Sequence, residues 1–258
     1  DWCWTWKDTL NCIRRDFHSV LNLMDDYPDV KFSLSQIPSY AAVKEHDPAN
    51  FARTLEYIKK GRWENLASTW VEGDLNMADG ESIARHLLYA ADWSEKNLGR
   101  RAECFWAPDT FGHPGNMPQI AKLGGCTSYF HWRCNPGGWK NQPARIWTGV
   151  DGTRMTTVSS AYGGTLLFGP SMFMSLCNTL DNIRLGLNVS HYVWGLGDHG
   201  GGLSRQQLKF FEEVRNRPLL PTYEFSTMAE YLNALRRDTS KLPKNCGETH
   251  TLFEGCYT

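Results

Sequence analysis

Residues 104–123 read CFWAPDTFGHPGNMPQIAKL, and this stretch sets out the unit from which the fold is built. The apolar run at 104–106 predicts a short buried strand, and the segment from about 118 to 123 predicts a helix. Between them lies a loop that carries Asp109 directly after the strand. We therefore expect a strand, a loop with a carboxylate at the strand tip, and a helix.

The same order of strand and helix repeats along most of the chain. Apolar spacing predicts helices around residues 13–24, 51–58, 83–98 and 176–183, and strands around 30–34, 128–132 and 192–194. A hairpin is expected over 145–159, turning at Asp151-Gly152, and capping boxes open helices at Ser204 and Thr227. This alternation predicts a mostly parallel sheet covered by helices, either as a barrel or as a doubly wound sheet. We expect one α/β domain over residues 1–240, and the polar residues 241–258 to begin a connection to something else.

Composition excludes several classes of protein. The 258 residues carry 27 basic and 28 acidic side chains, and this balance argues against a nucleic-acid partner. No apolar run approaches the ~18 residues that a membrane-spanning helix needs. The eight cysteines are scattered and form no CxxC pair, which predicts reduced thiols and no cysteine-ligated zinc. The compartment stays open, with unpaired-looking cysteines favouring the cytoplasm.

Loops at the carboxyl ends of parallel strands converge on one mouth, and three acidic segments follow expected strands there: 70–76, 106–112 and 194–202. Asp1 would make a fourth if a strand preceded it. Asp109 is held between Pro108 and Gly112, which would fix the approach and exit of the chain. Its alternative role is the N-cap of the next helix. Asp198 lies in a glycine-rich turn that lacks the lysine of a phosphate-binding loop, and its alternative is a simple Asx turn.

The eleven tryptophans point to carbohydrate when they are considered together with these carboxylates. An aromatic face packs on the apolar face of a sugar ring, while carboxylates and amides bind its hydroxyls. Seven tryptophans lie in or beside the proposed strand ends: Trp2, Trp4, Trp6, Trp70, Trp106, Trp132 and Trp194. For any single tryptophan, core packing remains the alternative.

At these segments the sequence resembles the N-terminal catalytic domain of glycoside hydrolase family 38, the retaining, metal-dependent α-mannosidases. The family opens with His-x-Asp-x-x-Trp, and residues 1–6, DWCWTW, are similar to its continuation without the His. Further matches are the segments 32–36 (FSLSQ), 61–63 (GRW), 70–76 (WVEGDLN), 80–82 (GES), 106–113 (WAPDTFGH), 197–202 (GDHGGG) and 255–258 (GCYT), with Pro118 in register. The resemblance spans essentially the whole chain and implies a (β/α)7-type barrel with mostly parallel strands and surrounding helices.

The resemblance also implies roles for individual residues. Asp109 would be both catalytic nucleophile and metal ligand, and Asp1 a second metal ligand. Trp4 would stack on the sugar at the cleavage site. Arg133 would reach the surroundings of the metal or a sugar hydroxyl. Asp198 would be the general acid/base.

Four more residues would line the substrate pocket: Glu72, Asp74, Asn76 and His199. Some family members carry a second carboxylate where this chain has His199, so the group that protonates the leaving oxygen stays open. The implied reaction is hydrolysis of α-mannosidic linkages in oligosaccharides or glycans, with retention and through a mannosyl-enzyme on Asp109. A divalent metal, expected to be zinc, would assist.

Two further metal ligands of the family, one histidine before residue 1 and one beyond residue 258, are not in this sequence. We therefore expect residues 1–258 alone to be weakly active or inactive. The alternatives to a mannosidase are a metal-dependent sugar deacetylase or amidohydrolase on a similar barrel, with Asp109 only a ligand or base, and a carbohydrate-binding remnant without activity.

Overall fold

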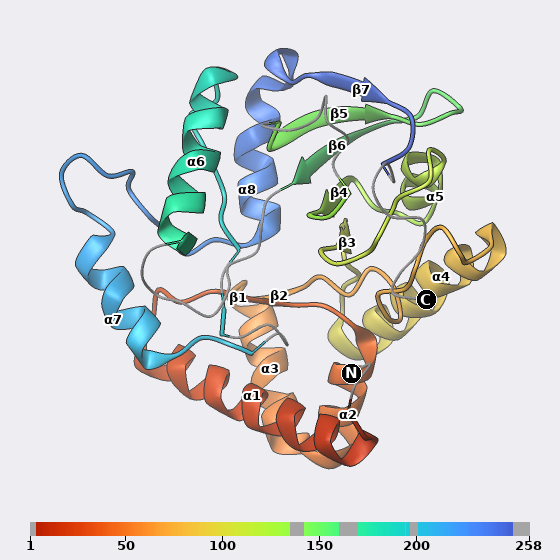
Figure 1. Cartoon of the computed structure of the whole chain (residues 1–258). Helices are drawn as coiled ribbons and strands as arrows, with labels where there is room; N and C mark the ends of the chain where they lie inside the picture. The colour runs from red at the N-terminus through yellow and green to blue at the C-terminus, as the bar shows by residue number, and fades with distance from the viewer. Residues whose placement is uncertain (1–3, 135–141, 160–169, 194, 197–200, 250–258) are drawn as a thin grey trace.

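The computed structural model describes residues 4–134, 142–159, 170–193, 195–196 and 201–249. The N-terminal part runs through α1 (Trp6–Asp26), β1 (Phe32–Leu34), α2 (Ile37–His46), α3 (Pro48–Lys59) and β2 (Trp63–Asn65). Strands β1 and β2 pair in parallel, with Phe32 opposite Trp63. Helices α1, α2 and α3 lie together against this pair (Figure 1), and their apolar faces form one buried cluster with it.

A second sheet holds the remaining described strands. The chain continues through α4 (Gly80–Leu98), β3 (Cys104–Ala107), α5 (Met117–Leu123), β4 (Ser128–His131), β5 (Ala144–Thr148), β6 (Arg154–Ser159), α6 (Pro170–Arg184), α7 (Arg205–Val214), α8 (Met228–Leu235), the 3-10 helix η2 (Arg236–Lys241) and β7 (Lys244–Cys246). The strand order is β3-β4-β6-β5-β7. All neighbours are parallel except β5 and β6, which form the expected hairpin. Strand β7 adds residues beyond 240 to this sheet.

The structure therefore confirms a mixed α/β fold with a mostly parallel sheet. Within the described residues the two sheets are separate and neither closes on itself, so a (β/α)7 barrel is not confirmed. The expected strand at 192–194 does not form over its described residues, because Tyr192 lies outside any element and Val193 makes only an isolated bridge. Beyond them, another isolated bridge joins Leu196 to Gly201. Helix α2 was not predicted. Its apolar residues point to several sides, so its sequence carries no clear helical stripe.

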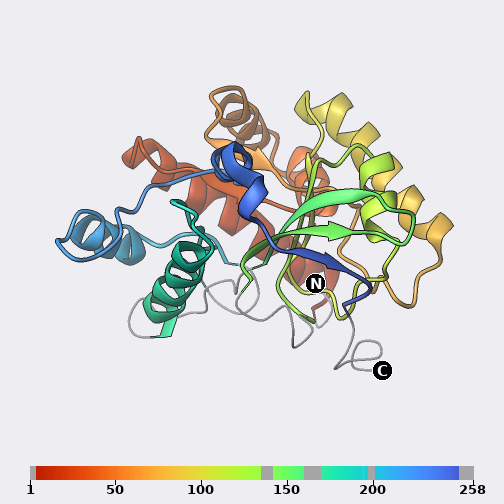
Figure 2. The ribbon, with the colours of Figure 1, turned by 90° about the horizontal axis from the view of Figure 1, so that it is seen from above.

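Helices cover both faces of the larger sheet (Figure 2). Because side chains alternate along a strand, Phe105 and Tyr129 face α4 and α5, whereas Trp106 and Phe130 face α8. The rings of Phe105 and Tyr129 stack at 4.7 Å, and those of Trp106 and Phe130 at 4.0 Å. Strands β3 and β4 are thus locked together on both faces by cross-strand aromatic pairs.

The helix ends follow the expected chemistry. Asp47 accepts a hydrogen bond from the Asn50 amide at the start of α3. The Ser204 and Thr227 capping boxes open α7 and α8 with both reciprocal bonds in place. Gly99 ends α4 with φ of 75°, a left-handed conformation that favours glycine.

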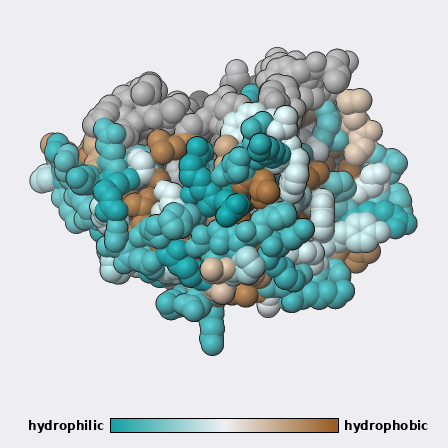
Figure 3. All heavy atoms as spheres, turned by 90° about the horizontal axis from the view of Figure 1, so that it is seen from below, coloured by the Kyte–Doolittle hydropathy of each residue, from teal (hydrophilic) through white to brown (hydrophobic). Residues whose placement is uncertain are grey.

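In the coloured part of the face shown in Figure 3, hydrophilic residues cover most of the surface, with smaller apolar areas between them. None of the described helices combines the length and apolar character needed to cross a bilayer. The six cysteines in the described part of the chain are free thiols, as expected.

Candidate active site

Asp109 lies where the sequence predicts it, two residues beyond the carboxyl end of β3. Arg133 has the equivalent position on the neighbouring strand β4. Ala107 at the end of β3 pairs with His131 at the end of β4, and Arg133 follows His131 by two residues, as Asp109 follows Ala107. Gly112 has φ of 104°, a conformation that favours glycine, and so lets the chain turn away after Asp109. The aromatic pairs between β3 and β4 therefore place Asp109 and Arg133 side by side.

The two side chains form an ion pair. Arg133 Nε donates to Asp109 Oδ1. The side chain of Asp109 is 46% exposed and that of Arg133 28%, so the pair is open to the mouth of the fold. The guanidinium also lies 4.5 Å from the ring centroid of Phe111 and 4.6 Å from that of Trp132. Ion pairing and cation–π contacts together fix its orientation.

Glu72 supports the same tip from the loop that precedes α4. Its Oε1 accepts a hydrogen bond from the Asp109 backbone amide and another, at 3.0 Å, from the Thr110 hydroxyl. Burial raises the pKa of Glu72 to about 7, which these hydrogen bonds oppose and the charge of Asp109 reinforces. The predicted pocket-lining glutamate thus contacts the backbone of the predicted nucleophile.

Asp74 and Asn76 lie in the same loop, but their described hydrogen bonds are within the loop and not to Asp109. Asp74 Oδ1 accepts from the amides of Asn76 at 2.9 Å and Met77 at 3.2 Å, which makes a turn, and its Oδ2 is buried without a hydrogen-bond partner. Next to this loop, a cavity of about 40 Å³ extends from Glu72 to His86 and has room for one or two water molecules.

A buried polar layer lies below the tip. His113 and Tyr129 are fully buried, and His113 Nδ1 lies 2.8 Å from the Tyr129 hydroxyl. Burial, and to a lesser extent the Arg145 charge, lowers the pKa of His113 to about 3. The rings of His113 and His131 are 4.8 Å apart. Composition and spacing did not single out this layer, because it depends on strand register.

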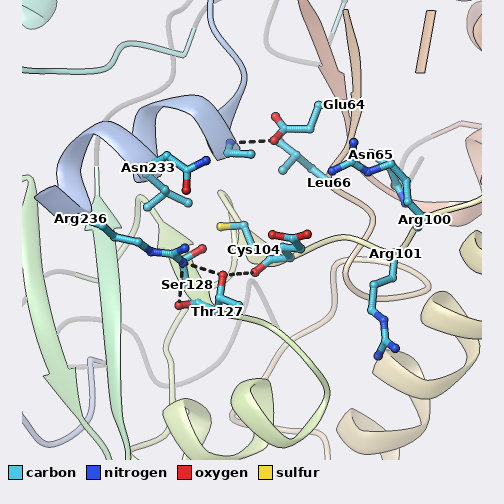
Figure 4. A pocket seen from close by; sticks show the side chains of 13 residues that line it. Glu64, Asn65, Leu66, Arg100, Arg101, Cys104, Thr127, Ser128, Asn233 and Arg236 are labelled. Atoms are coloured by element: carbon cyan, nitrogen blue, oxygen red, sulfur yellow. Dashed lines mark hydrogen bonds between the residues drawn. The ribbon is translucent and has the colours of Figure 1, made fainter. Parts of the chain in front are cut away.

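A second cavity lies at the opposite, amino ends of β3 and β4 (Figure 4). It encloses about 20 Å³ and is lined by both basic and acidic side chains, among them Arg100, Arg236, Glu64 and Glu103. Arg236 donates to the Thr127 hydroxyl at 2.6 Å. Its mixed charge and small size distinguish it from the open mouth at Asp109.

The remaining predicted site residues are placed only in part. Asp1, Asp198 and His199 lie outside the described residues. Trp4 is half-buried directly before Thr5, the N-cap of α1, and its stacking role stays a prediction. Within the described ranges, no three His, Cys, Asp or Glu side chains are arranged so that they could hold a metal ion. Asp109 supplies a half-exposed carboxylate, a donor that suits a divalent cation.

Residues 1–253 match the profile of the glycosyl hydrolases family 38 N-terminal domain. The chain belongs to glycoside hydrolase family 38. It is 31% identical over its whole length to alpha-mannosidase G of Dictyostelium discoideum and 29% identical to alpha-mannosidase 2C1 of Mus musculus. It covers 24% and 25% of those proteins, so the chain spans about a quarter of their length.

A solved structure, that of an alpha-mannosidase from Enterococcus faecalis V583, has a similar fold. The TM-score is 0.74 at 19% identity, over 95% of this chain and 29% of that one. The match to the family 38 profile includes the segments that carry Asp109, Arg133 and Glu72.

Proposed function

We propose that this family 38 protein hydrolyses α-mannosidic linkages in oligosaccharides or glycans, with retention of configuration. The observation that carries the proposal is the Asp109 carboxylate, which stands half-exposed at a strand tip and is oriented by Arg133. The mannosidase names of the relatives supply the substrate class.

In this mechanism Asp109 attacks the anomeric carbon while the bond to the leaving oxygen breaks. Asp198 gives its proton to that oxygen and then takes a proton from the water that hydrolyses the mannosyl ester. A retaining pair of this kind needs carboxyl groups about 5–5.5 Å apart. Trp4, Asp74, Asn76 and His199 are assigned to sugar binding.

The described contacts suit this role for Asp109. Arg133 balances the negative charge of the Asp109 carboxylate, and Glu72 accepts a hydrogen bond from the Asp109 backbone amide. The side chain and the backbone of Asp109 are therefore both fixed before substrate arrives. Preorganisation of this kind lowers the barrier to attack.

We further propose a divalent metal, expected to be zinc, bound by Asp109 and Asp1 with ligands from outside the described residues. When bound, it would hold the mannose 2- and 3-hydroxyls. Removing metal from the intact protein with a chelator should abolish activity, and added zinc should restore it. Unchanged activity in metal-free protein would exclude this part.

Covalent trapping tests the nucleophile. The intact protein is treated with 5-fluoro-mannosyl fluoride, digested and mapped by mass spectrometry. One sugar should be added to the peptide that contains Asp109, and Asp109→Asn should lose the label. Asp79→Asn is a matched control, because Asp79 caps α4 and asparagine caps equally well. Labelling elsewhere in an active protein would refute the assignment. Release of acetate from an acetylated sugar, with no mannose released from a mannoside, would indicate a deacetylase.

A further inference from the structure

A fully buried arginine lies behind the proposed nucleophile. Arg145 on β5 has no exposed surface, and neither has His131 at the end of β4. A buried guanidinium must be matched by acceptors, because its desolvation is expensive. Its Nη1 donates to the Gln142 carbonyl at 3.0 Å, and its Nη2 extends across β6 to His131 Nε2. Arg145 therefore spans from β5 to β4.

This contact decides which nitrogen of His131 carries the proton. A guanidinium only donates, so Nε2 of His131 must accept. The proton is then on Nδ1, which lies 3.0 Å from the Arg133 carbonyl oxygen and donates to it. Burial together with the charge of Arg145 lowers the pKa of His131 well below its ordinary value, so the ring is neutral.

A second observation concerns the residue that follows Arg133. Cys134 has φ of 62°, a left-handed conformation that costs a non-glycine residue about 1 kcal/mol or more. The Gly112 amide donates to its thiol, and the Arg133 carbonyl is held by His131. Such a conformation persists only where its surroundings hold it in place. The chain is thus fixed immediately before and after the peptide bond that follows Arg133.

We propose that His131, held by Arg145, is a positioning residue that fixes the Arg133 backbone and so directs its guanidinium to Asp109. The chain of contacts runs from Arg145 Nη2 to His131 Nε2, from His131 Nδ1 to the Arg133 carbonyl, and from Arg133 Nε to Asp109. The inference rests on the proposed role of Asp109, and it assigns a function to a buried pair that touches no substrate.

Two substitutions at one position separate positioning from folding. His131→Asn and His131→Leu both remove the acceptor for Arg145, but only asparagine keeps an N–H in the place of Nδ1. With an aryl α-mannoside and the intact protein, His131→Leu should lower kcat roughly 100-fold, because small misplacements at a reacting centre have effects of this size. KM should change less than about threefold, and His131→Asn should recover about tenfold in kcat.

His191→Asn is the matched control. It removes another histidine of the interior, a partly buried one that packs on Tyr231 with ring centroids 4.4 Å apart, and should leave kcat within about threefold. Equal losses of kcat in His131→Asn and His131→Leu would overturn the proposal. So would a loss confined to KM.

A spectroscopic measurement keeps the proposal testable even if both variants fail to fold. Solid-state NMR of wild-type protein labelled with ¹⁵N-histidine should show a neutral ring protonated at Nδ1, assigned to His131 by its short ¹⁵N–¹³C distance to the Arg133 carbonyl. An Nε2-protonated or charged ring would overturn the inference. If trapping fails to label Asp109, the proposed function is refuted. The NMR result on the His131 tautomer does not depend on that outcome, so the two failures can be told apart.

Discussion

The buried His113 should make the fold sensitive to acid by a predictable amount. Its pKa is about 3 in the folded protein, and that of a histidine in an unfolded chain is about 6.5. Between these values the unfolded chain binds the proton and the folded one does not. Stability from this group is therefore complete above pH 6.5 and is lost as the pH falls toward 3.

The size of the effect at pH 5 follows directly. This pH lies about 1.5 pH units below the unfolded value, and each pH unit corresponds to about 1.4 kcal/mol, so His113 should account for about 2 kcal/mol of lost stability. His113→Asn removes the titrating ring and keeps a polar atom near the Tyr129 hydroxyl. The variant should be less stable at pH 7, yet its free energy of unfolding should fall by about 2 kcal/mol less between pH 7 and pH 5.

Urea unfolding of both proteins at a series of pH values measures this difference. His191 stays in both, so its own contribution cancels. Loss of the His113 ring next to His131 acts in the same direction, because His113 also lowers the pKa of His131. Parallel stability curves for the two proteins would refute the reasoning.

Two further predictions concern glutamates. Glu72→Gln keeps an oxygen that accepts from the Asp109 amide, and it should retain kcat within about fivefold. Glu72→Ala removes that oxygen and should lower kcat at least tenfold. Equal kcat values in the two variants would show that this hydrogen bond does not affect catalysis. Glu64 accepts from the Met228 amide at 2.7 Å and the Ala229 amide at 2.9 Å at the start of α8. Glu64→Ala should therefore reduce the free energy of unfolding by about 3 kcal/mol in urea titrations, and Glu64→Gln by less; a loss below about 1 kcal/mol for alanine would contradict the capping role.

Local signals in the sequence predicted much of the fold. The helix caps at Asp47 and Thr227, the turn at Asp151-Gly152 and the stop at Gly99 are set by residues within a few positions, and the structure places each as expected. Helix α2 and the segment at 192–193 depend on packing against other elements. A single sequence does not carry that information. Whether the sheet closes into a barrel also depends on packing between distant elements, so it could not be predicted from local patterns either.

The candidate site shows the same division. Asp109 and Glu72 lie in acidic segments that follow expected strands, and Pro108 and Gly112 singled out Asp109. Arg133 was predicted only through the family resemblance. Arg145 was missed: alternation along its strand would make a charged residue there look exposed. Its burial follows from the strand order β4-β6-β5, which brings His131 within its reach.

The aromatic pairs between β3 and β4 have a consequence for how this site can change. Asp109 and Arg133 stand at equivalent heights because the two strands meet in one register. Sliding one strand by a single residue would shift its tip by about 3.3 Å and turn its side chains to the other face. Changes of strand register can therefore alter the distance between the Asp109 carboxylate and the Arg133 guanidinium only in steps of one whole residue. Substitutions in the stacked rings should leave the pair intact or lose it abruptly, so gradual tuning of the site has to come from the loops and from His131.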